Sequence, residues 1–118
     1  MTPCIVICHF ALPAPAEQAF IELARRSAAK FRKLGDRGLI SKDYVRGRDG
    51  AGGVYVWESR AAAEAWFTEE KLQEYTATFG VRPTLTWYDA HLTVDNEAGQ
   101  TRVNGEAIAE DASSDRDG

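Results

Sequence analysis

The chain has 118 residues, a net charge of −4 and 44% hydrophobic residues, which is typical of one domain with one modest core. Seven of its 18 acidic residues lie in the last stretch, residues 95–118, so the body that precedes it is close to neutral. Because the body carries no basic stripe, we expect no nucleic-acid partner.

The cysteine and hydropathy patterns address the compartment. Cys4 and Cys8 are the only cysteines, and they fall on one predicted strand. At ~3.3 Å per residue they lie about 13 Å apart, whereas a disulfide needs Cα atoms within about 7 Å. Reduced thiols are typical of cytoplasmic proteins. The apolar run 4–12 is too short to cross a bilayer, so we expect a cytoplasmic protein with no membrane contact.

The first half of the chain predicts two strands around a helix. Residues 4–10 are apolar on both faces, which indicates a central strand. Residues 15–34 follow helical spacing, and Gly35 is expected to end that helix. Residues 38–46 alternate with polar side chains, which suits a strand near an edge. Asp49-Gly50 is a strong hairpin signal before the next strand.

The stretch Gly52 to Arg60 is the centre of the pattern. It predicts a second central strand with valines on one face and Tyr55 and Trp57 on the other, followed by a helix. Ser59 is the expected N-cap of that helix, and a break near Thr68 divides it into two pieces. A last strand is expected over residues 82–94.

The element order is therefore β-α-β-β-α-β. It predicts an α+β, ferredoxin-like domain over residues 1–94, with a four-stranded antiparallel sheet and both helices on one face. The other face is apolar, which favours pairing with a second copy. Residues 95–118 are acidic and hold no aromatic residue, so we expect this tail to be disordered.

Three segments carry a family resemblance: Gly38-Leu39-Ile40-Ser41-Lys42, residues 52–59 and Phe79-Gly80-Val81. Residues 4–94 resemble the dimeric α/β-barrel proteins, in particular the small monooxygenase-like branch. The resemblance implies a homodimer whose two sheets close a barrel, with a pocket between helices and sheet in each subunit. Some members oxidise phenols or quinols without a cofactor, and others degrade haem.

The haem-degrading branch carries a Trp on the second helix and a proximal His ten positions later. Trp66 resembles that Trp, but position 76 is a threonine, with Tyr75 beside it, and neither predicted helix holds a histidine. The sequence therefore departs from the haem-degrading pattern.

His9 is the candidate catalytic residue. It lies on a central strand, and imidazole is the side chain best suited to proton transfer near neutral pH. A hydrogen-bonded structural histidine at a strand end is the alternative interpretation. Cys4, Cys8 and His9 do not form a convincing metal site, because Cys8 and His9 point to opposite faces of the strand. The sequence also holds no nucleotide or flavin motif.

Five further residues are candidates for binding a flat aromatic substrate. Tyr55, Trp57 and Trp66 could stack on it, with ordinary core packing as the alternative. Lys42 and Tyr44 share a strand face and could hold an anion, although Lys42 could equally be solvated. Trp87, Asp89 and His91 share a face of the last predicted strand. A catalytic dyad in which Asp89 orients His91 is the least favoured of the candidate sites.

The resulting hypothesis is a cofactor-independent monooxygenase that acts on a small phenolic or quinol-type molecule with O₂. A base such as His9 would remove a substrate proton, and the anion would reduce O₂ directly. The alternative is a non-catalytic dimer of the same fold that binds a small ligand or serves a stress response.

Overall fold

The computed structural model describes residues 1–109. Its elements in chain order are β1 (Cys4–Phe10), α1 (Glu17–Lys33), the 3₁₀ helix η1 (Leu34–Arg37), β2 (Leu39–Gly47), β3 (Gly50–Trp57), α2 (Arg60–Trp66), α3 (Glu69–Phe79), β4 (Thr84–Asp89), β5 (Leu92–Asp95), β6 (Gln100–Val103) and β7 (Glu106–Ile108). Up to β4 this confirms the β-α-β-β-α-β order, with the second helix in two pieces.

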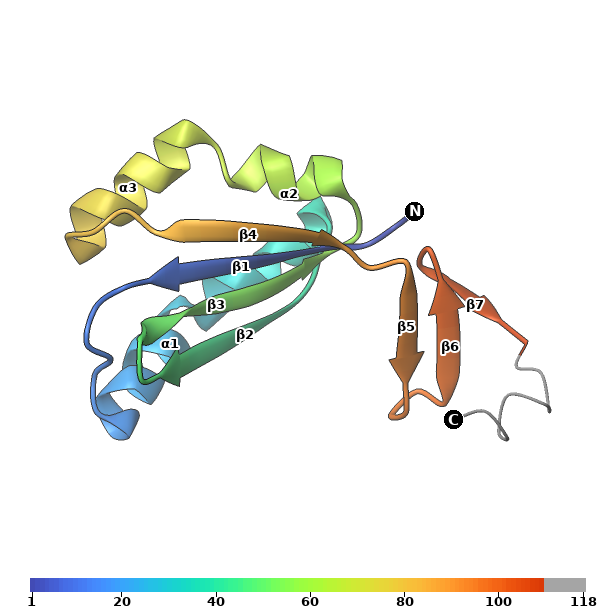
Figure 1. The fold of residues 1–118 in the computed structure, drawn as a ribbon, viewed down its shortest axis with the longest axis horizontal. Helices are drawn as coiled ribbons and strands as arrows, with labels where there is room; N and C mark the ends of the chain where they lie inside the picture. The colour runs from blue at the N-terminus through green and yellow to red at the C-terminus, as the bar shows by residue number, and fades with distance from the viewer. Residues whose placement is uncertain (110–118) are drawn as a thin grey trace.

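The main sheet is antiparallel throughout, with strand order β2-β3-β1-β4 (Figure 1). The strands that are apolar on both faces, β1 and β3, are the two central ones, as their sequences predict. The more polar β2 is an edge strand. Opposite residues fix the register: Cys4 lies between Trp57 and Asp89, and Val6 lies between Tyr55 and Trp87.

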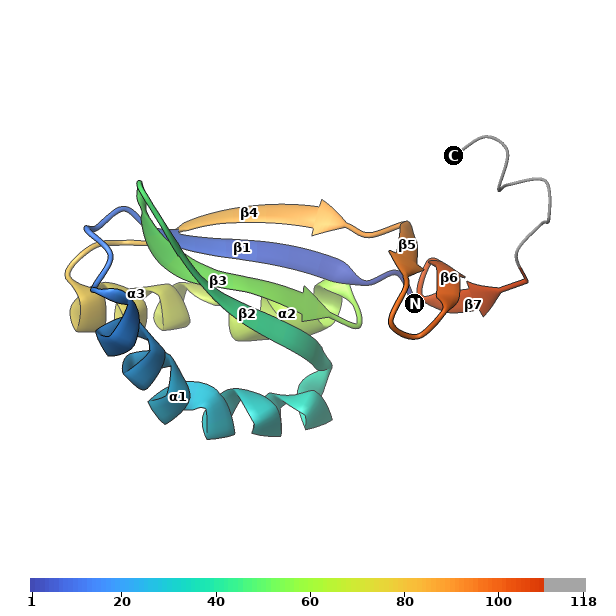
Figure 2. The same ribbon diagram turned by 90° about the horizontal axis from the view of Figure 1, so that it is seen from below.

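The helices cover one face of this sheet and leave the other uncovered (Figure 2). Alternation sends Cys4, Val6 and Cys8 of β1 into the helix side, where at most 1% of each residue is exposed. Leu72 and Phe67 close the core from the helix side. The predicted α+β ferredoxin-like architecture is confirmed. No helix within residues 1–109 is long and apolar enough to cross a membrane.

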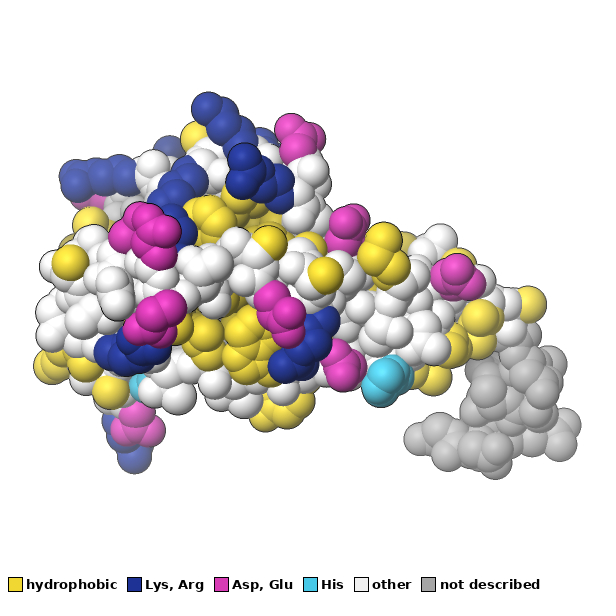
Figure 3. Space-filling view, turned by 90° about the horizontal axis from the view of Figure 1, so that it is seen from above, with side chains coloured by type: hydrophobic (Ala, Val, Ile, Leu, Met, Phe, Trp, Pro, Cys, Tyr) yellow, Lys and Arg dark blue, Asp and Glu magenta, His cyan; other side chains and the backbone are white. Residues whose placement is uncertain are grey.

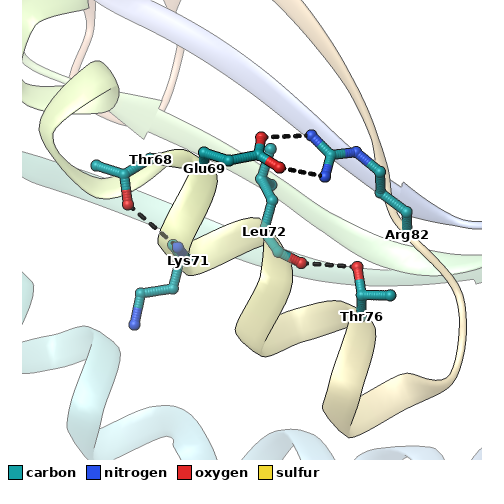
Figure 4. A network of polar contacts seen from close by, with 6 residues as sticks. All are labelled: Thr68, Glu69, Lys71, Leu72, Thr76 and Arg82. Atoms are coloured by element: carbon teal, nitrogen blue, oxygen red, sulfur yellow. Dashed lines mark hydrogen bonds and ion pairs between the residues drawn. The ribbon is translucent and has the colours of Figure 1, made fainter.

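Side-chain caps set the two short helices. The Ser59 hydroxyl accepts a hydrogen bond from the backbone N–H of Ala62, and the Thr68 hydroxyl accepts one from Lys71, both at 3.1 Å. In α3, Glu69 also holds Arg82 in a bidentate ion pair at 2.7 and 2.8 Å. Figure 4 shows the Lys71 side chain extending away from that pair, which leaves its ammonium group for another contact.

The end of α1 differs from the prediction. The α-helix ends at Lys33, close to the predicted end, but the chain continues through Gly35 as η1, and Gly38 rather than Gly35 takes the left-handed conformation with φ 98°. Any side chain at 38 would be strained there, and a Cβ would lie 2.8 Å from the Cγ of Glu58. The Gly38 carbonyl accepts from the Glu58 N–H at 2.7 Å, which ties this turn to the end of β3.

The last predicted strand, 82–94, and the disordered tail are both corrected. β4 ends at Asp89, and residues 92–108 form a second antiparallel sheet of order β5-β6-β7, here called the C-terminal arm. Asn104 and Gly105 make its tight turn with φ 48° and 84°. Residues 110–118, the remainder of the expected tail, lie outside the described residues.

The C-terminal arm lies beyond the end of the main sheet, beside the N-terminus (Figure 1). The backbone N–H of Ala90 donates to the carbonyl of Pro3 at 2.9 Å. The Asn104 side-chain oxygen lies 3.1 Å from the Thr2 hydroxyl and 3.0 Å from Nδ1 of His91. His91 therefore contacts the arm, and the alternative Asp89–His91 dyad is wrong because the strand breaks between these residues.

Candidate functional site

The candidate site is built around a lysine enclosed by aromatic rings. Lys42 lies opposite Tyr55 in the β2–β3 register, on the helix side of the sheet. Its Nζ is 3.3 Å from the ring centre of Phe31 on α1, 4.0 Å from that of Tyr44 and 4.6 Å from that of Tyr55. We call these four residues the lysine cage. Rings attract a cation at these distances through their negative faces.

The environment of the lysine cage weakens proton binding by its amine. Burial lowers the pKa of Lys42 from its ordinary value of 10.5 to about 7, and the positive charge of Lys30 adds to this shift; Cys8 would oppose it only as a thiolate. Burial also raises the pKa of the Cys8 thiol to about 11. Within residues 1–109 no carboxylate forms an ion pair with Lys42. A large share of the amine is therefore neutral at pH 7, the state that a general base requires.

Hydroxyl groups fix the rings around this amine. The Tyr44 hydroxyl is hydrogen-bonded to the Ser27 hydroxyl of α1 at 2.5 Å. The Trp66 indole N–H donates to the Tyr75 hydroxyl at 3.2 Å, and Tyr75 is in turn hydrogen-bonded to Tyr55. Burial raises the pKa of both Tyr55 and Tyr75, so both stay protonated at neutral pH. The walls of the site are thus positioned by a chain of polar contacts.

Two more ammonium groups lie against the same aromatic cluster. The Nζ of Lys30 is 5.4 Å from the Trp66 ring and 5.6 Å from the Phe31 ring, and the Nζ of Lys71 is 4.2 Å from the Trp66 ring. Lys71 also pairs with Glu74 at 2.7 Å. Figure 3 shows basic side chains gathered over α1 beside exposed hydrophobic surface. This combination suits a flat molecule that carries negative charge.

A cavity of about 310 Å³ opens beside the lysine cage, between α1, η1 and β2. Phe31, Lys42 and Tyr44 line one part of it, and Arg32 lines another. Its volume lies at the lower end of the range for small-molecule sites, roughly 300–1,000 Å³. The cavity is large enough for a single-ring molecule, and Lys42 is one of the residues that line it.

The structure brings together four of the six residues singled out from the sequence. Lys42, Tyr44, Tyr55 and Trp66 surround one aromatic cluster on the helix side. Trp57 lies deeper: it is 1% exposed, is parallel to the Tyr55 ring at 6.2 Å, and its indole N–H has no acceptor among the described residues.

His9 is the exception, since it lies away from this site. Adjacent residues of a strand point to opposite faces, and Cys8 points into the helix side. The half-buried His9 therefore faces the uncovered side of the sheet, with Gly52 and Thr84 as its strand partners. The base predicted for the pocket and the predicted binding residues are separated by the sheet.

Sequence reasoning missed three participants, Phe31, Tyr75 and Lys30. The first two fall at inward positions of their helices, a spacing that equally predicts ordinary core. The sequence signal for this site lies in the strands and not in the helices. Lys42 has an aromatic neighbour two positions later on the same strand face, and it stands opposite a second aromatic residue in the hairpin.

Comparison with known proteins supports the fold assignment at the level of structure but not of sequence. Neither a family model nor a curated protein matches the chain. Among solved structures, the chain is similar to a haem-degrading protein from Mycobacterium tuberculosis, determined haem-free with cleaved protein. The identity is 24%, the TM-score is 0.51, and the match covers 80% of this chain and 97% of that one. The chain thus has a ferredoxin-like fold.

The site residues fit haem only in part. Aromatic walls and ammonium groups suit a flat anion, but within residues 1–109 no histidine faces the cavity, since His9 is on the other sheet face and His91 contacts the arm. A tyrosinate can also hold haem iron. The raised pKa values of Tyr55 and Tyr75 oppose that form. Within residues 1–109, neither a histidine nor Tyr55 or Tyr75 therefore offers haem iron a favourable axial ligand on this side of the sheet.

Proposed function

We propose that the protein is an oxygenase-like enzyme that binds a small phenolic or quinol-type molecule beside the lysine cage and oxidises it with O₂. One observation carries this proposal: an amine with a pKa of about 7, enclosed by three rings, borders a cavity of single-ring size. Oxidative chemistry on this fold is supported by the resemblance to the cofactor-independent monooxygenases and by the haem-degrading structural neighbour.

Lys42 takes the role that the sequence suggested for His9. Its neutral amine accepts the phenolic proton, and the resulting ammonium stays beside the phenolate it has produced. Lys30 and Lys71 add positive charge near the aromatic cluster and favour the anion further. The anion then gives electrons to O₂: a phenol with a free para position and one O₂ yield a quinone and one water.

Oxygen uptake with a panel of quinols and naphthols tests the proposal. We expect uptake by the wild-type protein and a loss of about 100-fold or more in Lys42→Met, the scale of a lost general base. Lys33→Met is the matched control, because Lys33 lies exposed on the same helix as Phe31 and should retain full activity. Activity should also rise with pH through about 7, where the amine loses its proton.

The same assay separates the enzyme from a non-catalytic binding protein. If the protein only binds its ligand, a bound quinol should quench the tryptophan fluorescence of the protein through Trp66, but no oxygen should be consumed. Uptake that is unchanged in Lys42→Met, or lost equally in His9→Ala and Lys42→Met, would contradict the assignment of the base to Lys42.

A further inference from the structure

Lys42 differs from the other lysines of the chain in what surrounds its amine. The other three are Lys30 and Lys33, which are exposed on α1, and Lys71, which is paired with Glu74. Lys42 alone is enclosed by three rings and borders the cavity, and within residues 1–109 it has no carboxylate partner. An amine in that position is a nucleophile as well as a base.

We propose that Lys42 captures small aromatic aldehydes or ketones that carry an acid group, forming a covalent imine in the cavity. The amine lone pair attacks the carbonyl carbon and a C–N bond forms. Both protons of the nitrogen pass to the carbonyl oxygen, which leaves as water, so the step needs no oxidant or reductant. The activity goes beyond oxygen chemistry and does not depend on it.

The cavity explains why this class of carbonyl compound is favoured. Its volume of about 310 Å³ accommodates one ring, and Phe31 and Tyr44 offer the faces on which such a ring stacks. Arg32 lines the same cavity and can hold a carboxylate in a bidentate contact.

The charged and titratable groups around Lys42 favour the free amine. Lys30 on α1 disfavours the ammonium form, and Arg32 on the same helix adds a second positive charge at the cavity. Cys8 on β1 is kept as a neutral thiol by burial. The hydroxyls of Tyr44 and Tyr55 complete the surroundings: that of Tyr44 is hydrogen-bonded to Ser27, and burial raises the pKa of Tyr55, which stays protonated at neutral pH.

Reductive trapping tests the proposal. The full chain is incubated at pH 7 without oxygen with 4-carboxybenzaldehyde and sodium cyanoborohydride, and adducts are located by intact mass and peptide mapping. We expect Lys42 to be labelled at least about tenfold faster than Lys30, Lys33 or Lys71, because nearly all of an ordinary lysine is protonated at pH 7. Benzaldehyde, which lacks the carboxylate, should label Lys42 more slowly.

Controls make each outcome decisive. Lys42→Met should lose the fast adduct and Lys33→Met should keep it, and the protein unfolded in urea should lose the preference. Labelling spread evenly over the four lysines of the folded wild-type protein would overturn the proposal, and that map is decisive even if a variant fails to fold. Because trapping uses no oxygen, its failure and a failure of oxygen uptake are separate results.

Discussion

At the residue scale, the unusual feature is a lysine whose surroundings oppose its charge. Folding places the amine of Lys42 among rings, and no carboxylate within residues 1–109 forms an ion pair with it. Cation–π attraction returns only part of the lost hydration, since burial still lowers the pKa to about 7. Such an arrangement is costly for stability, which is why a strongly shifted pKa in a cavity indicates function.

The shift predicts how stability depends on pH. The unfolded chain holds a proton on Lys42 up to its ordinary pKa of 10.5, whereas the folded protein releases it near 7. Because the unfolded state binds more protons between these values, the free energy of unfolding should rise as pH increases from about 7 to 10. The penalty is full below pH 7 and amounts to at most about 5 kcal/mol.

Urea unfolding of wild type and Lys42→Met between pH 6 and 10 measures this effect. Methionine keeps the length and apolar stem of the side chain, so the packing on Phe31 should persist. The variant should be the more stable protein at pH 6, and its advantage should shrink steadily up to pH 10. A difference that stays constant with pH would mean that Lys42 titrates as it does in water.

At the scale of elements, the close approach of β1 and β3 depends on two glycines of β3, Gly50 and Gly52, of which Gly52 comes nearer to the β1 backbone. A Cβ at Gly52 would lie 1.9 Å from the carbonyl oxygen of Cys8 and 3.1 Å from the Cα of His9. Both are backbone atoms of the central strand β1, so a methyl group cannot be accommodated by turning a side chain.

Gly52→Ala should therefore lower the free energy of unfolding by about 2 kcal/mol or more, the scale of overpacking in a core. Gly47→Ala is the matched control at the end of β2, where nothing lies within 4 Å of the added Cβ; its effect should stay within about 0.5 kcal/mol. Equal melting temperatures for the two variants would show that β1 and β3 do not approach this closely.

The elements also show what the sequence could predict. Strands β1 and β3 were assigned correctly because both their faces are apolar, and the caps Ser59 and Thr68 because their hydroxyls stand just before helical spacing. The C-terminal arm was missed because its short strands are largely polar. Its one strong signal was local: Asn104-Gly105 is the sequence that a two-residue hairpin turn prefers.

The site was predicted less completely than the fold. The faces of β2 and β3 follow from alternation, so Lys42, Tyr44 and Tyr55 could be grouped from the sequence alone. Alternation also shows why His9 does not belong to this pocket. Cys8 of β1 points to the helix side, so the adjacent His9 points to the opposite face of the sheet. Which ring approaches the amine depends on how α1 packs on the sheet, which no single-sequence pattern determines.

At the scale of the whole molecule, the uncovered sheet face determines the expected assembly. Ile5 and Ile7 of β1 stand opposite Val56 and Val54 of β3 on the side that carries no helix. An apolar sheet face without a covering layer favours pairing with a partner surface. Pairing two copies would bury on the order of 1,600 Å² in total, a standard stable interface.

Sedimentation at low micromolar concentration should therefore give twice the chain mass, and Ile7→Lys should shift the protein towards monomer. The ammonium of that variant would face a second apolar sheet in the dimer, where burial of an unpaired charge is strongly unfavourable, but only water in the monomer. Ile21→Lys is the matched control, because Ile21 is 39% exposed on α1 and lies on the opposite side of the sheet. A wild-type monomer, or equal effects of the two substitutions, would contradict pairing through this face.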